Sequence, residues 1–463
     1  MQWQKTVSRY VFPAIMMSVL PTAALCAAQV GPGTDLMVPI DYVPAINQLV
    51  AADRSEELNA GPFYKKAFDL YVERPDQLKQ LNQKTWVAGL SAEQQPALEK
   101  WLQQNSPAFD ELKKGADKPH CWFRYEGGSM WEIKPPHLLK ARRLADALCW
   151  RAKVKAARGE FKDAFSDLGL CYRYGMHWSG TGPVFEQLAG ITITAISNSA
   201  AFRILDNTKA PADQLKEFQQ QLEKLSAEYA HIIGFAVEKF VMYDTAQGAF
   251  TDYNSGLPRI SQAQLDKMKG MLKLSDQQVQ DLKQVDGPNT IEITDKVYNY
   301  FGEAARKTPW QLHKENQNIK ETAQRITKGN PFVPIFLPDA DRVTQLSWRN
   351  KAAADALITT LAVLRYKTDK GQLPDKLDLL VSEGCLKQLP MDPYGDKPLV
   401  YKKTSDNFTL YSLGADFDDD SGAPSNWGEG QKGGDMVFWP VQRPKESADK
   451  KQVTNARTHT EKE

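Results

Sequence analysis

The sequence predicts a mainly α-helical N-terminal region, built as an irregular helical array, followed by a small α+β domain of one helix and an antiparallel sheet. Two observations predict this fold class. From about Val38 to Ile326, apolar residues recur at spacings of three and four, which is the pattern of amphipathic helices. After Gly371, short alternating runs joined by turn residues, LVYKK and FTLYSL, are typical of paired strands.

The composition is that of an ordinary globular protein. The chain has 463 residues, of which 42% are hydrophobic, and a formal net charge of +1. This is enough apolar material for a substantial core, spread over about two or three domains. A net charge near zero argues against nucleic acid as a partner, and the sequence contains no glycine-rich phosphate loop.

The first 28 residues have the layout of a signal peptide. Lys5 and Arg9 precede an apolar run, and small residues follow up to Ala28. Two prolines interrupt the run, which disfavours a permanent membrane span, although an uncleaved membrane anchor stays open. We therefore expect an exported protein of the periplasm or cell envelope, which contacts a membrane only if this segment is uncleaved.

Residues 29–329 are predicted to form the helical domain. Ser91 followed by Gln94 has the spacing of a capping box, as has Ser275 followed by Gln278. The segment 137–175 predicts a helical hairpin with its turn at a glycine, and its residue order resembles a tetratricopeptide repeat. A period of ~34 residues is not sustained, which favours an irregular array over a true solenoid.

Two cysteines of this hairpin are predicted to face each other. Cys149 lies ten residues before the turn at Gly159 and Cys171 lies twelve after it, so both sit at similar heights on neighbouring helices. Packed helix axes are ~8–10 Å apart, which is wide for an easy disulfide. The spacing favours two buried thiols, and a disulfide stays open.

The prolines of residues 330–345 predict an exposed or extended linker, because proline blocks both helix continuation and central strand pairing. The helical pattern resumes near Trp348, at the start of an α+β domain expected over 346–440. Residues 441–463 contain almost no apolar side chain, and we expect a disordered tail there.

Several motifs follow one another in this last domain. An alanine-rich helix ends in a Tyr366, Gly371, Pro374 pattern, and DPYG, SLGAD and GGDMVF come after it. In this order they resemble the soluble domain of the major pseudopilin of type II secretion systems, over about residues 352–438. The resemblance implies a helix packed on a small sheet, a calcium-binding loop and a role related to secretion. Pseudopilins begin with their membrane helix, whereas here a long helical region comes first, so we expect a reused domain and not a filament subunit.

The stretch LYSLGADFDDDSG, residues 410–422, places four aspartates within five residues. Such carboxylates repel one another, so either water and salt screen them or a cation holds them together. An EF-hand does not fit, because Ser421 stands where the turn glycine should be and Trp427 where a bidentate Glu should be. A solvated acidic loop is the alternative to a metal site.

The resemblance implies calcium ligands in this loop. Asp416 and the closing Asp435 match family positions, and Gly433 stands where the family often has a further aspartate. One of residues 418–420 would supply the missing oxygen. The candidate calcium ligands are therefore Asp416, Asp418, Asp420 and Asp435.

Evidence for catalysis is sparse. The six histidines form no HExxH arrangement. The aromatic segment Cys121–Glu132 carries Glu126 and Glu132, and paired carboxylates in a groove perform acid–base chemistry. The other interpretation is an irregular loop packed on helices.

We therefore expect a non-catalytic envelope binding or assembly protein, with a protein partner on the helical domain and a calcium site in the C-terminal domain. The alternative is an envelope hydrolase with its site at Cys121–Glu132.

Overall fold

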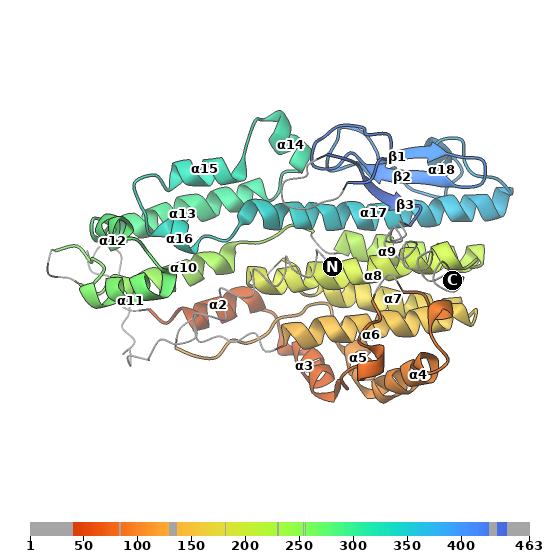
Figure 1. Cartoon of the computed structure of the whole chain (residues 1–463), viewed down its shortest axis with the longest axis horizontal. Coiled ribbons are helices and arrows are strands. Elements are labelled where there is room, and N and C mark those ends of the chain that lie inside the picture. The colour runs from red at the N-terminus through yellow and green to blue at the C-terminus, as the bar shows by residue number, and fades with distance from the viewer. Residues whose placement is uncertain are drawn as a thin grey trace, which may run out of the picture.

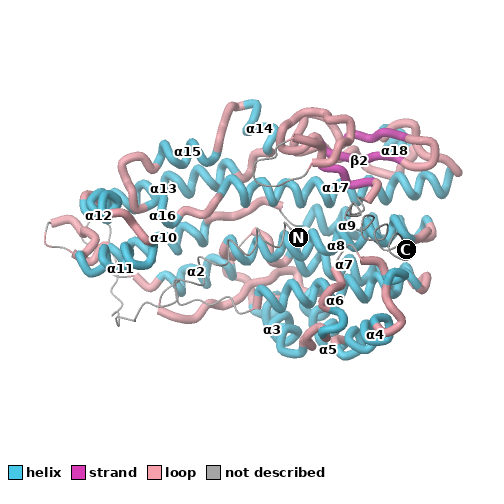
Figure 2. Tube along the Cα trace, viewed as in Figure 1, coloured by secondary structure: helices cyan, strands magenta, loops and turns pink. Residues whose placement is uncertain are grey.

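The computed structural model describes residues 40–441 apart from 83–84, 129–136, 181, 229–230, 253, 255 and 426–432. The chain is mostly helical, with a three-stranded antiparallel sheet near its C-terminal end (Figures 1 and 2). The predicted fold class is confirmed. The predicted signal peptide and the predicted tail from residue 442 onward lie outside the described residues.

Among the residues that the structure describes, eight α-helices lie in the first half of the chain, and α6 to α9 lie side by side in the bundle of Figure 1. Their bounds are α2 (Tyr42–Ala51), α3 (Gly61–Leu70), α4 (Gln94–Gln104), α5 (Ser106–Ala116), α6 (Leu138–Ala157), α7 (Phe161–Met176), α8 (Val184–Asn207) and α9 (Ala212–Glu228).

Nine α-helices follow in the described part of the second half. They are α10 (Ala236–Ala249), α11 (Gln262–Leu272), α12 (Asp276–Lys283), α13 (Gly287–Ala304), α14 (Pro309–Lys314), α15 (Ile319–Ile326), α16 (Val333–Phe336), α17 (Ala340–Lys370) and α18 (Asp378–Ser382). The predicted capping boxes are present: Ser91 and Gln94 exchange both hydrogen bonds, and Ser275 and Gln278 do the same at the start of α12.

The predicted hairpin is α6 and α7, with Gly159 at the turn in the left-handed region (φ 80°) that glycine adopts without strain. Cys149 and Cys171 face each other with their sulfur atoms 3.6 Å apart, and both are buried free thiols. Burial raises the pKa of the Cys149 thiol well above its ordinary value. The favoured interpretation, two buried thiols, is confirmed.

The C-terminal sheet lies on α17, as Figure 1 shows. Its strands are β1 (Val400–Lys403), β2 (Phe408–Ser412) and β3 (Met436–Trp439), in the order β1-β2-β3. Tyr401 pairs with Leu410, which in turn pairs with Trp439. A register shift between Leu410 and Tyr411 lies at the end of β2 that leads into the acidic loop.

The prediction of an exposed or extended linker at 330–345 is wrong. Phe332 and Val333 are 0% exposed, and Phe332 packs against Phe250 with ring centroids 5.0 Å apart. The prolines do not prevent this, because they stand at or just before helix starts, where a missing N–H costs nothing. Helix α17 begins at Ala340, well before the expected Trp348, with Asp339 as its N-cap.

One hydrophobic core joins the helical region to the C-terminal unit. Leu357 and Leu361 of α17 belong to the same cluster as Phe218 of α9 and Trp439 of β3. Helix α8 is also apolar and long enough to cross a membrane, but 83% of its apolar window is buried inside the protein. The two regions therefore share apolar surface that neither can bury alone.

Candidate functional site

Hydrogen bonds to Asp392 hold the start of the acidic loop. Asp392, in the DPYG turn, accepts hydrogen bonds from the Ser412 hydroxyl (2.7 Å) and from the backbone N–H of Leu413 (2.9 Å) and Tyr394 (3.0 Å). Burial raises the pKa of Asp392, and these donors oppose the rise. The turn therefore fixes the point at which β2 ends and the loop begins.

Two of the predicted ligands, Asp416 and Asp420, come together at Gly434. The N–H of Gly434 donates to Oδ2 of Asp416 and to Oδ2 of Asp420, at 2.9 Å each, and Asp435 is the next residue. Gly434 has a φ of 99°, and a Cβ there would lie 2.8 Å from the backbone of Ser425. Only glycine permits this close return of the chain beneath the carboxylates.

Asp435 is a buried carboxylate with one oxygen that accepts no hydrogen bond. Its side chain is 1% exposed, Oδ2 accepts from the N–H of Gly422 at 2.6 Å, and Oδ1 has no hydrogen-bond partner. Burial raises the pKa of Asp435 to about 6, and the carboxylates of Asp419 and Asp420 add to this rise. The backbone N–H groups of Gly422 and Asp420 oppose it. A buried carboxylate oxygen without a donor is costly, and a cation would satisfy it.

The other two aspartates of the loop have different partners. Asp418 accepts from the N–H of its neighbour Asp419 at 2.9 Å, within the exposed part of the loop. Asp419 accepts from the Tyr411 hydroxyl at 2.7 Å, which lowers the pKa of Asp419. The structure thus brings Asp416 and Asp420 together at Gly434, and Asp420 also lies near enough to Asp435 to affect its pKa. Asp418 accepts no hydrogen bond from Gly434.

The arrangement fits calcium by its chemistry. In the described part of the chain, no group of three or more His, Cys, Asp or Glu side chains stands as a ready metal site. Asp416 and Asp420 instead share the Gly434 N–H, so each would exchange that donor for the ion. Calcium accepts carboxylate, backbone carbonyl and water oxygens in tolerant geometry, and the orphaned Oδ1 of Asp435 is such an oxygen.

The aromatic segment that begins at Cys121 is a loop packed on helices. The side chain of Asn47, on α2, makes two hydrogen bonds with the backbone of Tyr125. Its Nδ2 donates to the Tyr125 carbonyl (2.9 Å), and its Oδ1 accepts from the Tyr125 N–H (2.8 Å). Glu126 is exposed, and Glu132 lies outside the described residues. The expected pair of carboxylates is therefore not seen in the part of this segment that the structure describes.

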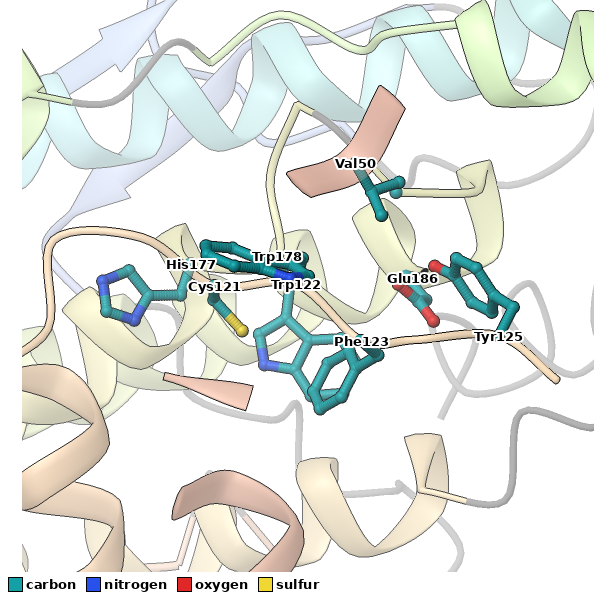
Figure 3. A pocket seen from close by; sticks show the side chains of 9 residues that line it. Val50, Cys121, Trp122, Phe123, Tyr125, His177, Trp178 and Glu186 are labelled. Atoms are coloured by element: carbon teal, nitrogen blue, oxygen red, sulfur yellow. Dashed lines mark hydrogen bonds between the residues drawn. The ribbon is translucent and has the colours of Figure 1, made fainter. Parts of the chain in front are cut away.

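A different carboxylate reaches the segment. Glu186, in the first turn of α8, accepts from the Tyr125 hydroxyl at 2.9 Å (Figure 3). Together with Cys121, Trp122 and Trp178, it lines a small cavity of about 10 Å³, which is room for about one water molecule. Burial raises the pKa of Glu186 to about 7, and the hydrogen bond from Tyr125 opposes this.

A second acid lies near the same point. Glu238 of α10 accepts from the N–H of Val184 at 2.7 Å and so caps α8, whose own N-cap residue Pro183 offers no side-chain acceptor. Burial raises the pKa of Glu238. Sequence reasoning missed both acids, because a glutamate in the first turn of a helix is an ordinary helix-start residue.

The chain matches no protein-family model, no curated protein and no solved structure at a significant level. The pseudopilin resemblance therefore rests on its motifs alone.

Proposed function

We propose that this protein is an exported, non-catalytic binding or assembly protein of the cell envelope whose pseudopilin-like C-terminal unit binds calcium. The observation that carries the calcium site is the buried Oδ1 of Asp435, which lacks a donor in a loop where Asp416 and Asp420 converge. The signal-peptide pattern of residues 1–28 supports export, and the long helical region offers the surface for a protein partner.

The calcium site is tested on the full chain, because α17 shares its core with the helical region. Thermal melts with millimolar calcium and with chelator should differ, with a gain of ~2.7 kcal/mol at a hundredfold excess of ion over its dissociation constant. The substitution Asp416→Ala should remove this difference, because it deletes a converging carboxylate.

The matched control is Asp418→Asn, in the same loop. The Asp418 carboxylate accepts from the adjacent N–H of Asp419, whereas Asp416 and Asp420 accept from Gly434, so the Asp418 variant should keep the calcium response. A wild-type melt that calcium does not shift would leave a solvated acidic loop. Equal losses in both variants would point to general loop charge and not to a defined site.

A second candidate function is hydrolysis, favoured by Glu186, a buried acid beside the Tyr125 hydroxyl and a cavity of about 10 Å³ that has room for one water molecule. An acid with a pKa of about 7 can donate or accept a proton near neutral pH. Turnover of chromogenic ester or glycoside substrates by wild type, lost in Glu186→Gln, would favour the enzyme. Equal background rates for both proteins would remove this candidate.

A further inference from the structure

An aromatic residue in the middle of the acidic loop, Phe417, has its ring against another part of the chain. Phe417 stands between Asp416 and Asp418, and its ring stacks on His313 of α14 with centroids 4.3 Å apart and an interplanar angle of 22°. The ring of Trp310, also on α14, lies 5.9 Å from that of Phe417. The loop that gathers the carboxylates is thus in direct contact with the helical region.

A second contact joins α14 to the same unit. The backbone N–H of Trp310 donates to the carbonyl of Pro393 at 3.1 Å, within the DPYG turn. Tyr394 of that turn is also near Phe417, with ring centroids 6.3 Å apart. In Figure 1, α14 lies beside the loops of the sheet, far along the chain from them. Helix α14 therefore packs on both loops that frame the carboxylates.

The backbone of Phe417 needs this support. Its φ is 65°, in the left-handed region, which is disfavoured for a bulky side chain and persists only where surrounding contacts hold it. The ring contacts with α14 hold Phe417 from one side. An ion bound by Asp416, the residue before it, would hold the same backbone from the other side.

We propose that calcium binding by the acidic loop and docking of α14 are energetically coupled through Phe417. This inference rests on the proposed calcium site and adds its regulation. Docked α14 fixes Phe417 and so positions Asp416 for the ion, and the bound ion in turn stabilises the docked α14. Linkage requires that each event strengthen the other by the same factor.

The coupling extends into the helical region. Helix α14 is followed after a short turn by α15, which contacts both α13 and α17. Calcium would therefore stabilise one arrangement of α14 against the sheet and fix the surface that this part of the helical region presents to a partner.

The test uses the full chain and two measurements. Calorimetric titration gives the calcium affinity of wild type, His313→Ala and the control Lys320→Ala. His313 and Lys320 are both exposed, so neither change is expected to unfold the protein. Because His313 contributes a ring contact and not an oxygen of the acidic loop, only the coupling predicts an effect of its removal. We expect His313→Ala to weaken calcium binding by roughly two- to tenfold, the range for loss of one stacked ring pair, and Lys320→Ala to leave it unchanged.

Hydrogen exchange with and without calcium is the second measurement. Calcium should protect both the loop, 412–425, and the segment 309–317 in wild type, and only the loop in His313→Ala. Protection of the loop alone in wild type, with unchanged affinity in His313→Ala, would overturn the coupling and leave the calcium site standing. No binding and no protection anywhere would overturn the calcium site and the coupling with it.

Discussion

The substitution Asp435→Asn tests the buried carboxylate on which the proposed site depends. Asparagine keeps an oxygen that can accept from the Gly422 N–H, but it carries no charge at any pH. We expect this variant to be more stable than wild type without calcium at pH 7, and to lose the calcium response. A purely structural role for Asp435 predicts the opposite sign for the first effect.

The magnitude follows from the pKa of Asp435, raised from 3.8 to about 6 by burial. The folded chain then holds this proton more tightly than the unfolded chain, so the free energy of unfolding falls as pH rises from about 4 to about 6. At ~1.4 kcal/mol per pK unit the upper limit is ~3 kcal/mol. Water around the exposed neighbouring aspartates screens the charge, so we expect ~1–2 kcal/mol at pH 7.

The assay is denaturant unfolding of the full chain at pH 4 and pH 7, with chelator and with calcium. Without calcium, Asp435→Asn should match wild type near pH 4 and exceed it at pH 7. With calcium, wild type should gain stability at pH 7 and lose that gain below about pH 6, where Asp435 takes up its proton. A variant that is less stable than wild type at pH 7, or that still responds to calcium, would refute the reasoning.

Two further predictions concern the helical region. Limited proteolysis followed by mass spectrometry should find no early cut in 330–345, because Phe332 and Val333 are 0% exposed; rapid cleavage there would show that this segment opens. Lys153 is 0% exposed, and burial lowers its pKa to about 7. The unfolded chain therefore binds this proton more tightly, and stability due to Lys153 rises with pH between about 7 and 10. In urea unfolding, Lys153→Met should reduce the increase in the free energy of unfolding between pH 7 and 10, and should stabilise the protein at pH 6. The same pH dependence in the variant and in wild type would contradict this.

The sequence predicted the features that depend on neighbouring residues. The hairpin of α6 and α7, the capping boxes at Ser91 and Ser275, and strands β1 and β2 all arise from local spacing and turn chemistry. The acidic loop was equally visible, because four aspartates in five residues need no fold to be noticed. Helices and strands can be recognised in the sequence because the backbone fixes the period at which their apolar side chains recur.

The bounds of α17 were not predictable in the same way. Proline chemistry at 330–345 allows both an exposed connector and a set of helix starts, and only burial decides between them. Phe332 is buried against Phe250, a residue far away in the sequence, and that contact places the segment inside the core.

The identity of the converging acids was also decided by tertiary structure alone. Asp418 and Asp420 are equivalent in the sequence, but the return of the chain at Gly434 selects Asp420 and buries Asp435. In the sequence, Glu186 resembles an ordinary first-turn glutamate; in the folded chain, burial raises its pKa although the Tyr125 hydroxyl donates to it. Residue types and spacing thus determined which groups could act, while desolvation and long-range packing determined which of them meet, because the cost of burying a charge depends on every surface that covers it.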